Sequence, residues 1–583
     1  MLHTLTRSLR ENKGPALVTV LLSALEVVFE IVIPLFMSNL IDFGIEGGSM
    51  AAVWKFGAFL LLLAAFQLST GVLAARIAAR ASVGFAANLR EHMYNNVQTF
   101  AFSNIDKFST ASIVTRLTTD TTNVQNAFQM LMRMAIRAPV MLIFSMIVSF
   151  RISRDISMTF LIILPILALA LFFIIRSVFP VFTRVFRTYD ELNNVVQENV
   201  RGIRVVKSFN QERHEIGKFG AISERIYKDF SKGERLITLN APLMQFCIYT
   251  CMIVISWLGA KAIIASGNNP ALGLTTGNLT ALITYTMQIL SSLMMLSMVF
   301  AMLTISLSSA RRIAEVLEER SDIPQPEQPV MTVRDGAVDF DHVSFVYASK
   351  ADKKVLDDID LHIRSGETIG IIGGTGASKS SLVQLIPRLY DVTGGKLTLG
   401  GVDVRDYDLD TLRGAVAMVL QKNELFSGTI AENLRWGNEN ATDEQLRHAC
   451  KLACADGFIS AMPDGYDTHI EQGGTNVSGG QKQRLCIARA LLKKPKVLIL
   501  DDSTSAVDTR TDAQIQQALS TYIPDTTKII IAQRISSVQN ADRIVVLDDG
   551  HIDAVGCHDE LLRTCEIYRE VYESQQKGGE DDA

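Results

Sequence analysis

Residues Val497–Asp508 have the sequence VLILDDSTSAVD, and this stretch decides the fold of the C-terminal half. Its first four residues are aliphatic, which predicts a buried strand that ends at two adjacent carboxylates. Shortly before it, Val477–Gln481 (VSGGQ) predicts a phosphate-binding loop that opens a helix. Upstream, Gly373–Ser381 (GGTGASKSS) follows Glu367–Ile372 (ETIGII), which predicts another strand. Strand, glycine-rich loop and helix in this order predict an α/β P-loop domain.

The N-terminal half has a different character, because long apolar runs dominate it up to about residue 310. A helix needs roughly 20 mostly apolar residues to cross the hydrocarbon core of a bilayer. Six segments meet this requirement: residues 16–41, 53–78, 134–151, 156–179, 241–265 and 277–305. The sequence therefore predicts a multi-domain protein, in which an all-α six-helix transmembrane domain precedes an α/β P-loop nucleotide-binding domain.

The connections between these segments differ in length and charge. Residues 79–133 and 180–240 are long and rich in Arg and Lys, whereas residues 42–52 and 266–276 are short and contain neither. Basic connections tend to stay in the cytoplasm. We therefore expect a multi-pass protein of the cell membrane, with both termini and the nucleotide-binding domain in the cytoplasm, although Arg151 and Arg154 beside a short connection oppose this rule.

Composition sets the domain boundaries and excludes some partners. Three prolines within residues 321–329 predict a linker. We expect a transmembrane domain at 1–320, a linker at 321–335, a nucleotide-binding domain at 336–575 and a disordered tail at 576–583. The seven cysteines lack paired zinc-site spacing, and a net charge of −5 gives no basis for a nucleic-acid partner.

The P-loop, the VSGGQ loop and the VLILD strand together resemble the ATP-binding cassette (ABC) family. The order of the two domains resembles a half-transporter of the type IV exporter fold, and the resemblance covers essentially the whole chain. It implies ATP and Mg²⁺ as cofactors and coupling helices near residues 102–108 and 207–213. The residues that it implies contact the nucleotide are Tyr347, Gly373, Gly374, Thr375, Gly376, Ala377, Ser378, Lys379, Ser380, Ser381, Ser478, Gly479, Gly480, Gln481 and Asp508.

The same resemblance assigns the chemical roles. It implies Ser380, Gln421 and Asp501 as the Mg²⁺ ligands, and Asp502, Gln533 and Gln421 as the catalytic positions. Tyr347 matches the aromatic residue on which the adenine stacks. Ser378 stands where the pattern has glycine, so we expect a crowded loop and weakened binding of ATP.

Two further departures change the functional expectation. Asp502 stands where hydrolysing members have Glu, and its carboxylate is one methylene shorter. Gln533 replaces the switch His, and an amide cannot carry a positive charge. A misplacement of roughly 1 Å can cost about 100-fold in rate, so we expect a degenerate site that binds ATP and hydrolyses it poorly.

The intact signature loop implies a different partner. In this family each site pairs the P-loop of one domain with the signature loop of the other. Ser478, Gly479 and Gln481 would then complete the site of a second, non-identical half-transporter that carries the consensus Glu and the switch His. The expectation is a heterodimeric ATPase and translocase that moves amphipathic or hydrophobic, drug-like compounds out across the membrane.

For the transported compound, the sequence offers candidate residues in the first and last spans, each with a structural alternative. Glu26 and Glu30 lie four residues apart within the first span, where carboxylates are costly, and they could attract cationic amphiphiles. Alternatively, they form a structural contact to another helix. Met294 and Met298 belong to a helically spaced methionine group in the last span that could adapt to varied ligands or simply pack against helices or lipid.

Two other functions remain open at this point. One is a homodimer that exports lipid or peptide and hydrolyses ATP slowly through Asp502. The other is a membrane subunit that senses ATP and regulates without transporting. The homodimer predicts ATP turnover by the purified chain alone, whereas the regulatory subunit predicts ATP binding without stimulation by a transported substrate.

Overall fold

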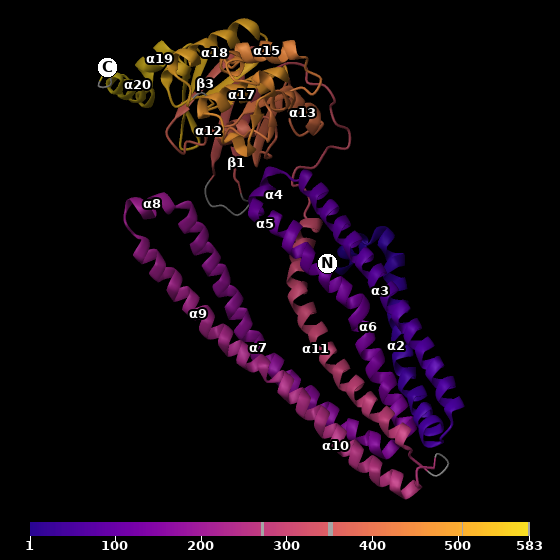
Figure 1. The fold of residues 1–583 in the computed structure, drawn as a ribbon. Coiled ribbons are helices and arrows are strands. Elements are labelled where there is room, and N and C mark those ends of the chain that lie inside the picture. Colours follow the sequence, from indigo (N-terminus) through magenta and orange to yellow (C-terminus); the bar gives the residue numbers. More distant parts are fainter. Residues whose placement is uncertain (270–272, 348–353, 504, 581–583) are drawn as a thin grey trace. The chain divides into compact units, whose positions relative to one another are not determined.

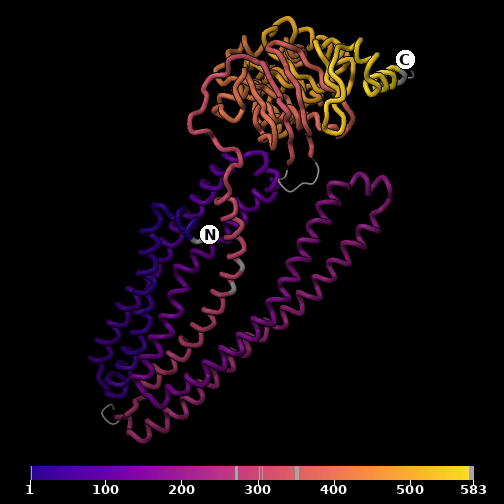
Figure 2. The backbone as a smooth tube through the Cα atoms, turned by 180° about the vertical axis from the view of Figure 1, so that it is seen from behind, coloured from indigo at the N-terminus to yellow at the C-terminus, as the bar shows by residue number. Residues whose placement is uncertain are grey.

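The structure is a computed structural model that describes residues 1–269, 273–347, 354–503 and 505–580. The chain forms two compact units, each traced in Figures 1 and 2. The helical unit comprises Met1–Gln98 and Thr110–Glu319. The nucleotide-binding unit comprises Thr99–Ser109 and Arg320–Ala583.

The helical unit consists of long helices joined by short turns. In chain order it contains α1 (Leu2–Arg7), η1 (Arg10–Asn12), α2 (Lys13–Asn39), η2 (Leu40–Glu46), α3 (Met50–Gln98), α5 (Thr110–Thr115), η3 (Arg116–Asp120), α6 (Thr121–Ile152), α7 (Arg154–Arg201), α8 (Ile203–Ser208), α9 (Glu212–Thr238), α10 (Asn240–Ser266) and α11 (Thr276–Glu318). Six stretches built from these helices are long and apolar enough to cross a membrane. The predicted six-helix class is therefore confirmed.

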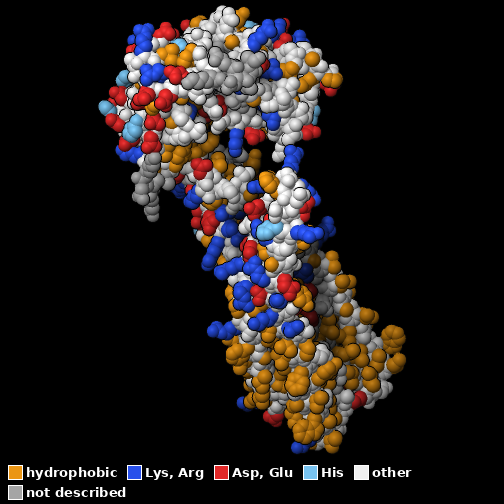
Figure 3. All heavy atoms as spheres, turned by 90° about the vertical axis from the view of Figure 1, so that its left-hand side faces the viewer, with side chains coloured by type: hydrophobic (Ala, Val, Ile, Leu, Met, Phe, Trp, Pro, Cys, Tyr) orange, Lys and Arg blue, Asp and Glu red, His pale blue; other side chains and the backbone are white. Residues whose placement is uncertain are grey.

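The helices continue well beyond the apolar segments that predicted them. α3 has 49 residues and α7 has 48, roughly twice the length that a bilayer core requires. Figure 3 shows hydrophobic side chains gathered over one end of the helical unit, with Lys and Arg side chains over its other part. Large apolar residues such as Trp257 and Ile264 are exposed on α10, as expected of a surface that contacts lipid.

The interior of the helical unit is an apolar cluster shared by five of the long helices. It includes Val27 of α2, Met141 of α6, Phe160 of α7, Ile255 of α10 and Leu290 of α11, all of them buried. Tyr285 of α11 also belongs to this cluster, and its hydroxyl donates to the backbone oxygen of Ile31 in α2 at 2.6 Å.

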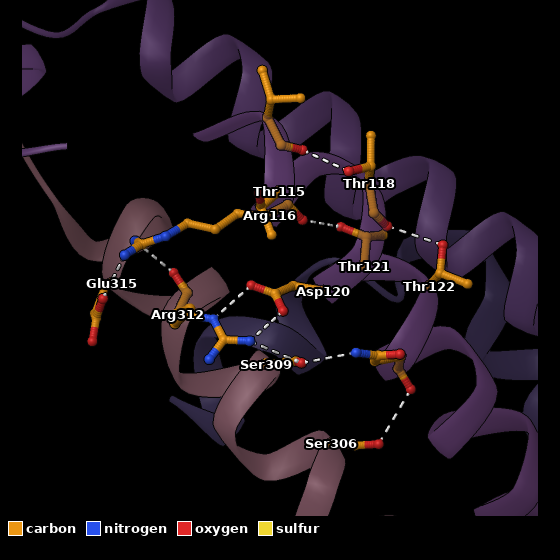
Figure 4. A network of polar contacts seen from close by, with 12 residues as sticks. Thr115, Arg116, Thr118, Asp120, Thr121, Thr122, Ser306, Ser309, Arg312 and Glu315 are labelled. Atoms are coloured by element: carbon orange, nitrogen blue, oxygen red, sulfur yellow. Dashed lines mark hydrogen bonds and ion pairs between the residues drawn. The ribbon is translucent and has the colours of Figure 1, made fainter. Parts of the chain in front are cut away.

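A polar network joins η3 and the start of α6 to α11 where these helices leave the apolar region (Figure 4). Arg312 of α11 forms a two-pronged ion pair with Asp120, its Nε lying 2.7 Å from Oδ2. Arg116 donates to the backbone oxygen of Arg312 at 2.9 Å and to Glu315 at 3.0 Å. Asp120 is only 1% exposed, and Arg312 supplies the counter-ion that a buried carboxylate needs.

The nucleotide-binding unit is built on two main sheets. Its strands are β1 (Val338–Phe345), β2 (Leu356–Ile363), β3 (Thr368–Gly373), β4 (Gly394–Leu399), β5 (Val402–Asp403), β6 (Val416–Val419), β7 (Gly428–Thr429), β8 (His469–Ile470), β9 (Val497–Asp501), β10 (Thr527–Ile531), β11 (Arg543–Asp548) and β12 (His551–Gly556). One sheet is antiparallel, in the order β2-β1-β4-β5. The other has the order β12-β11-β3-β10-β9-β6 and is parallel except for β12.

Helices connect and cover these strands. They are α4 (Phe102–Lys107), α12 (Lys379–Gln384), α13 (Leu409–Ala415), α14 (Ile430–Arg435), α15 (Asp443–Leu452), α16 (Asp456–Ser460), α17 (Gly479–Leu492), α18 (Thr509–Tyr522), α19 (His558–Thr564) and α20 (Glu566–Glu580), with short 3₁₀ turns η4 (Gly465–Asp467), η5 (Gln472–Gly474) and η6 (Ile535–Ser537). The predicted α/β class is confirmed. Strands β3 and β9 fall where the sequence predicted them, and ligands of such sheets bind at the carboxyl ends of the strands.

Two segments lie differently from the domain boundaries expected from the sequence. Residues Thr99–Ser109 belong to the nucleotide-binding unit, where Tyr390 donates to Asp106 at 2.8 Å. Helix α20 continues to Glu580 through most of the expected tail, because each residue added to a formed helix gains a backbone hydrogen bond. The last expected tail residues, 581–583, lie outside the described residues.

The network of Figure 4 predicts that replacing two neighbouring arginines lowers the stability of the helical unit to different extents. Arg312→Ala leaves the buried Asp120 carboxylate without its counter-ion and is expected to destabilise the helical unit by about 1–3 kcal/mol. The control is Arg311→Ala, which removes the adjacent exposed arginine. Thermal unfolding of the purified chain in detergent measures the effect, and equal melting temperatures for the two variants would contradict it.

Candidate nucleotide-binding site

The P-loop connects the end of β3 to the start of α12. Gly373 ends the strand, and a Cβ at this position would meet the backbone oxygen of Leu547 at 2.1 Å, so only glycine fits. Gly374 and Gly376 lie at the exposed tip, where an added Cβ would meet nothing within 4 Å. The loop thus presents its backbone to solvent with room for a phosphate group, as a P-loop requires.

Ser378 occupies the last position before α12 and adopts the left-handed conformation, with φ of +67°. Glycine adopts this conformation freely, whereas a residue with a Cβ pays roughly 1–2 kcal/mol. The sequence predicted a crowded loop at this position. The structure adds that the cost lies in the backbone conformation.

The Lys379 ammonium is folded back over the loop. Its Nζ donates to the backbone oxygens of Gly373 at 2.9 Å and Gly374 at 2.8 Å. Burial lowers the pKa of Lys379, while the carboxylates of Asp501 and Asp502 oppose that change. The lysine is therefore held at the mouth of the loop, close to where the predicted phosphates would lie.

Ser380 and Asp501 meet at the carboxyl end of β9. The Ser380 hydroxyl donates to Asp501 Oδ1 at 3.0 Å, and the carboxyl is only 3% exposed. Burial raises the pKa of Asp501, and the hydrogen bond from Ser380 opposes that rise. A hydroxyl and a carboxylate oxygen side by side are the donor types that hold Mg²⁺ in P-loop proteins, so the residues present fit the ion.

Asp502 is the next residue, and two amides converge on it. It has φ of +48° and lies almost buried at the end of the strand. Gln533 Nε2 donates to its Oδ2 at 2.8 Å, and Gln421 Nε2 lies 3.5 Å from the same oxygen. Burial raises the pKa of Asp502, against hydrogen bonds from Gln421 and Gln533 and the charge of Lys379. The three residues predicted at the catalytic positions are thus brought together.

Tyr347 lies beside the P-loop helix. Its hydroxyl is 2.7 Å from the Ser381 hydroxyl of α12, and its ring meets Phe345 and Tyr390 edge to face at 4.8 Å and 5.1 Å. These neighbours fix the ring, yet 45% of the residue remains exposed. A fixed, half-exposed aromatic ring fits the predicted role as a stacking platform for a base.

The signature loop forms the N-terminus of α17. Ser478 caps the helix reciprocally with Gln481: the serine hydroxyl accepts from the Gln481 N–H, and the glutamine amide oxygen accepts from the Ser478 N–H. Gly480 is required by close approach, because a Cβ there would lie 2.8 Å from the oxygen of Ala506. Ser478 and Gly479 are exposed, so the loop is rigid and accessible.

A buried glutamine that the sequence analysis did not single out connects the signature helix to Asp502. Gln483 of α17 accepts from the N–H of Ala506 at 3.1 Å and donates to the Ser505 hydroxyl at 3.3 Å. Ser505 in turn donates to the backbone oxygen of Asp502 at 3.0 Å. A glutamine on the otherwise apolar buried face of α17 was the available signal, because buried polar groups need partners.

Asp508 lies at the start of α18, a few residues beyond these contacts. Its carboxylate accepts from the N–H of Thr511 at 2.9 Å and caps the helix. Hydrogen bonds from Thr511 lower the pKa of Asp508. Capping keeps this loop ordered at its end, where the resemblance implies contact with a nucleotide.

The predicted substrate residues lie in the helical unit. Arg137 of α6 donates to Glu26 at 2.7 Å and to Glu30 at 2.6 Å, so one guanidinium bridges both carboxylates. This is the structural contact that the sequence analysis named as the alternative to substrate binding. On α11, Met298 is exposed and Met294 is half-buried. A role in substrate binding stays a prediction for all four predicted residues.

Comparison with known families gives two matches in one chain. Residues 16–294 match the ABC transporter transmembrane region, and residues 356–505 match the ABC transporter family of ATP-binding domains. The chain is 35% identical over 558 residues to the ABC transporter ATP-binding protein YfiB of Bacillus subtilis, covering 96% of each protein. It is 33% identical over 580 residues to the ABC transporter ATP-binding protein MT1311 of Mycobacterium tuberculosis, covering 99% of this chain and 98% of that protein.

Among solved structures, the fold is similar to that of a bacterial Atm1-family ABC exporter with ATP bound. The TM-score is 0.82, and the match covers 97% of this chain and 99% of the other at 23% sequence identity. The likeness therefore extends over both units of the chain and concerns the fold.

The left-handed conformation of Ser378 predicts an ordered series of substitutions. Ser378→Val is expected to destabilise the nucleotide-binding unit by about 1–2 kcal/mol, because a β-branched residue fits poorly at positive φ. Ser378→Gly should stay within about 1 kcal/mol of the wild type, since relief of strain offsets the added freedom of the unfolded chain. Thermal unfolding tests the series, and a valine variant as stable as the glycine variant would contradict it.

Proposed function

The chain belongs to the ABC transporter family, and on that basis we propose that it is one subunit of a heterodimeric ATP-driven exporter. In this proposal it binds Mg²⁺-ATP at a degenerate site of its own. It lends its signature loop to the hydrolytic site of a second, non-identical half-transporter. The cargo is an amphipathic or hydrophobic, drug-like compound that leaves across the cell membrane.

The environment of Asp502 is the observation that carries this proposal. A general base for hydrolysis must offer a carboxylate oxygen to the attacking water. Here Oδ2 already accepts from Gln533, and Gln421 lies within reach of the same atom. The side chain is also one methylene shorter than Glu. A short carboxylate with one oxygen already engaged favours binding of ATP over its hydrolysis.

The signature loop supports the second half of the proposal. Ser478 and Gln481 cap each other and Gly479 is exposed, so the loop is preorganised for a phosphate group supplied from outside this P-loop. The catalytic positions Asp502 and Gln533 depart from the consensus, yet the signature loop is intact. This combination is expected if the signature loop completes the site of a partner that supplies the Glu and the His. A homodimer is the alternative, favoured by the fact that Asp502 still offers a carboxylate.

Topology and cargo rest on the helical unit. The long basic connections extend α3 and α7 beyond the apolar segments and form α9, which supports cytoplasmic termini and a cytoplasmic nucleotide-binding unit. The likeness to an exporter fold supports outward transport. Glu26 and Glu30 share one guanidinium, that of Arg137, so acidic groups outnumber their basic partner among apolar helices, which supports a cationic amphiphile as cargo.

If this chain mainly binds ATP and the partner's site hydrolyses it, ATPase activity should depend on the partner. The chain purified alone should turn over ATP slowly, and activity should appear when it is combined with the proposed partner half-transporter. Gln481→Ala in this chain should then lower the activity of the pair at least about tenfold, since it removes an amide from the signature loop of the hydrolytic site. Phosphate release measures the rates.

The controls for this assay are substitutions at the degenerate site. Asp502→Asn should change the activity of the pair little, because hydrolysis takes place at the other site. Strong activity of the chain alone that disappears with Asp502→Asn would establish a working homodimer and overturn the proposal. ATP binding without stimulation by any transported compound would favour the regulatory subunit.

Restoring the two consensus residues should restore hydrolysis. The double variant Asp502→Glu with Gln533→His is expected to raise the ATPase rate of the chain alone by about tenfold or more, because this chain already carries an intact signature loop. Either single change should give much less, since the carboxylate and its neighbour act together. An unchanged rate in the double variant would show that these two residues do not limit hydrolysis.

A further inference from the structure

Helix α20, near the end of the chain, contacts the segment that carries Gln533. The side chain of Gln575 makes two hydrogen bonds to the backbone there. Its Oε1 accepts from the N–H of Ile535 at 2.9 Å, and its Nε2 donates to the oxygen of Gln533 at 2.7 Å. One amide therefore bridges two backbone groups that lie two residues apart, with both its donor and its acceptor engaged.

The position of Gln575 on α20 explains this reach. Tyr568 is fully buried, and Val571 and Tyr572 pack against the same apolar cluster, which also contains Ile535. Residues 568, 571, 572 and 575 lie on one face of a helix. Gln575 is thus the polar end of the face by which α20 docks, and the docked aromatic residues hold it against the start of η6.

The bridged segment reaches the ATP site. The Gln533 amide donates to Asp502 at 2.8 Å, and Arg534 donates to the oxygen of Val507 at 3.4 Å, next to Asp508. Ser537, at the other end of η6, donates to a carboxylate of α18. A displacement of the backbone at residues 533–535 therefore moves both the amide that holds Asp502 and the contact with the Asp508 loop.

We propose that Gln575 is a positioning residue of the ATP site, which acts through the backbone of the 533–535 segment to aim the Gln533 amide at Asp502. Its role rests on the proposed function of this site as a binder of Mg²⁺-ATP. In this proposal Gln575 acts through the backbone and not through contact with nucleotide or metal. The C-terminal helix thereby becomes part of the nucleotide-binding machinery rather than a mere covering element.

The test uses the full chain in lipid nanodiscs and compares two neighbouring glutamines. Gln575→Met keeps the length of the side chain and removes both hydrogen bonds. The matched control is Gln576→Met, which removes a hydrogen bond to Tyr572 within the same helix. Gln575→Glu is the conservative variant, because it keeps an acceptor for the Ile535 N–H and loses the donor.

Two readouts separate positioning from simple packing. Amide hydrogen exchange of peptides covering residues 529–540, measured without nucleotide, should be about threefold to tenfold faster in Gln575→Met than in Gln576→Met. Binding of Mg²⁺-ATP should weaken by a similar factor at an unchanged melting temperature, and Gln575→Glu should fall between. Equal exchange in both methionine variants overturns the proposal, as does faster exchange with unchanged ATP affinity.

The proposed function can fail separately. A wild-type chain that binds no Mg²⁺-ATP overturns the degenerate-site function, and the role of Gln575 at the ATP site with it. If the wild type binds Mg²⁺-ATP and Gln575→Met binds it equally well, the role of Gln575 is overturned and the proposed function stands.

Discussion

Burial of β9 is the constraint on which the nucleotide-binding unit depends. All five of its residues are buried, and β6 and β10 pair with it on either side. The pairing with β10 aligns Asp501 with Ile531, and the Asp502 N–H donates to the oxygen of Ile531 at 2.9 Å. The distance between Asp502 and Gln533, two residues beyond Ile531, is therefore set by the register of the sheet. A register shift of one residue would separate them.

The helical unit depends on polar contacts instead. In lipid, apolar helices gain little from burying more apolar surface, so packing and interhelical hydrogen bonds distinguish one arrangement from another. Arg137 with its two carboxylates and Tyr285 with Ile31 connect α2 to α6 and α11 within the apolar region. Beyond it, the Asp120–Arg312 ion pair joins η3, which directly precedes α6, to α11. Polar contacts therefore hold α2, α6 and α11 together at several positions along their length.

The sequence predicted most of the fold, because the signals were local. Hydropathy identified the six spans, and aliphatic runs that end in glycine or aspartate identified β3 and β9. The P-loop and signature residues followed from motifs of a few adjacent positions. Contacts between distant residues were not predictable in this way: Arg137 lies 111 positions from Glu26, and Gln575 lies 42 positions from Gln533. Neither Arg137 nor Gln575 belongs to a sequence motif, and their partners become apparent only when the helices are packed.

The pairing of Gln533 with Asp502 also bears on how the site responds to acidity. A histidine at this position would gain a proton near neutral pH and change its charge. The Gln533 amide remains the same neutral donor at every physiological pH, so this side of the 2.8 Å contact does not change its charge when the pH falls. In the proposed heterodimer, the partner's histidine would change its charge with pH, whereas position 533 of this chain would not.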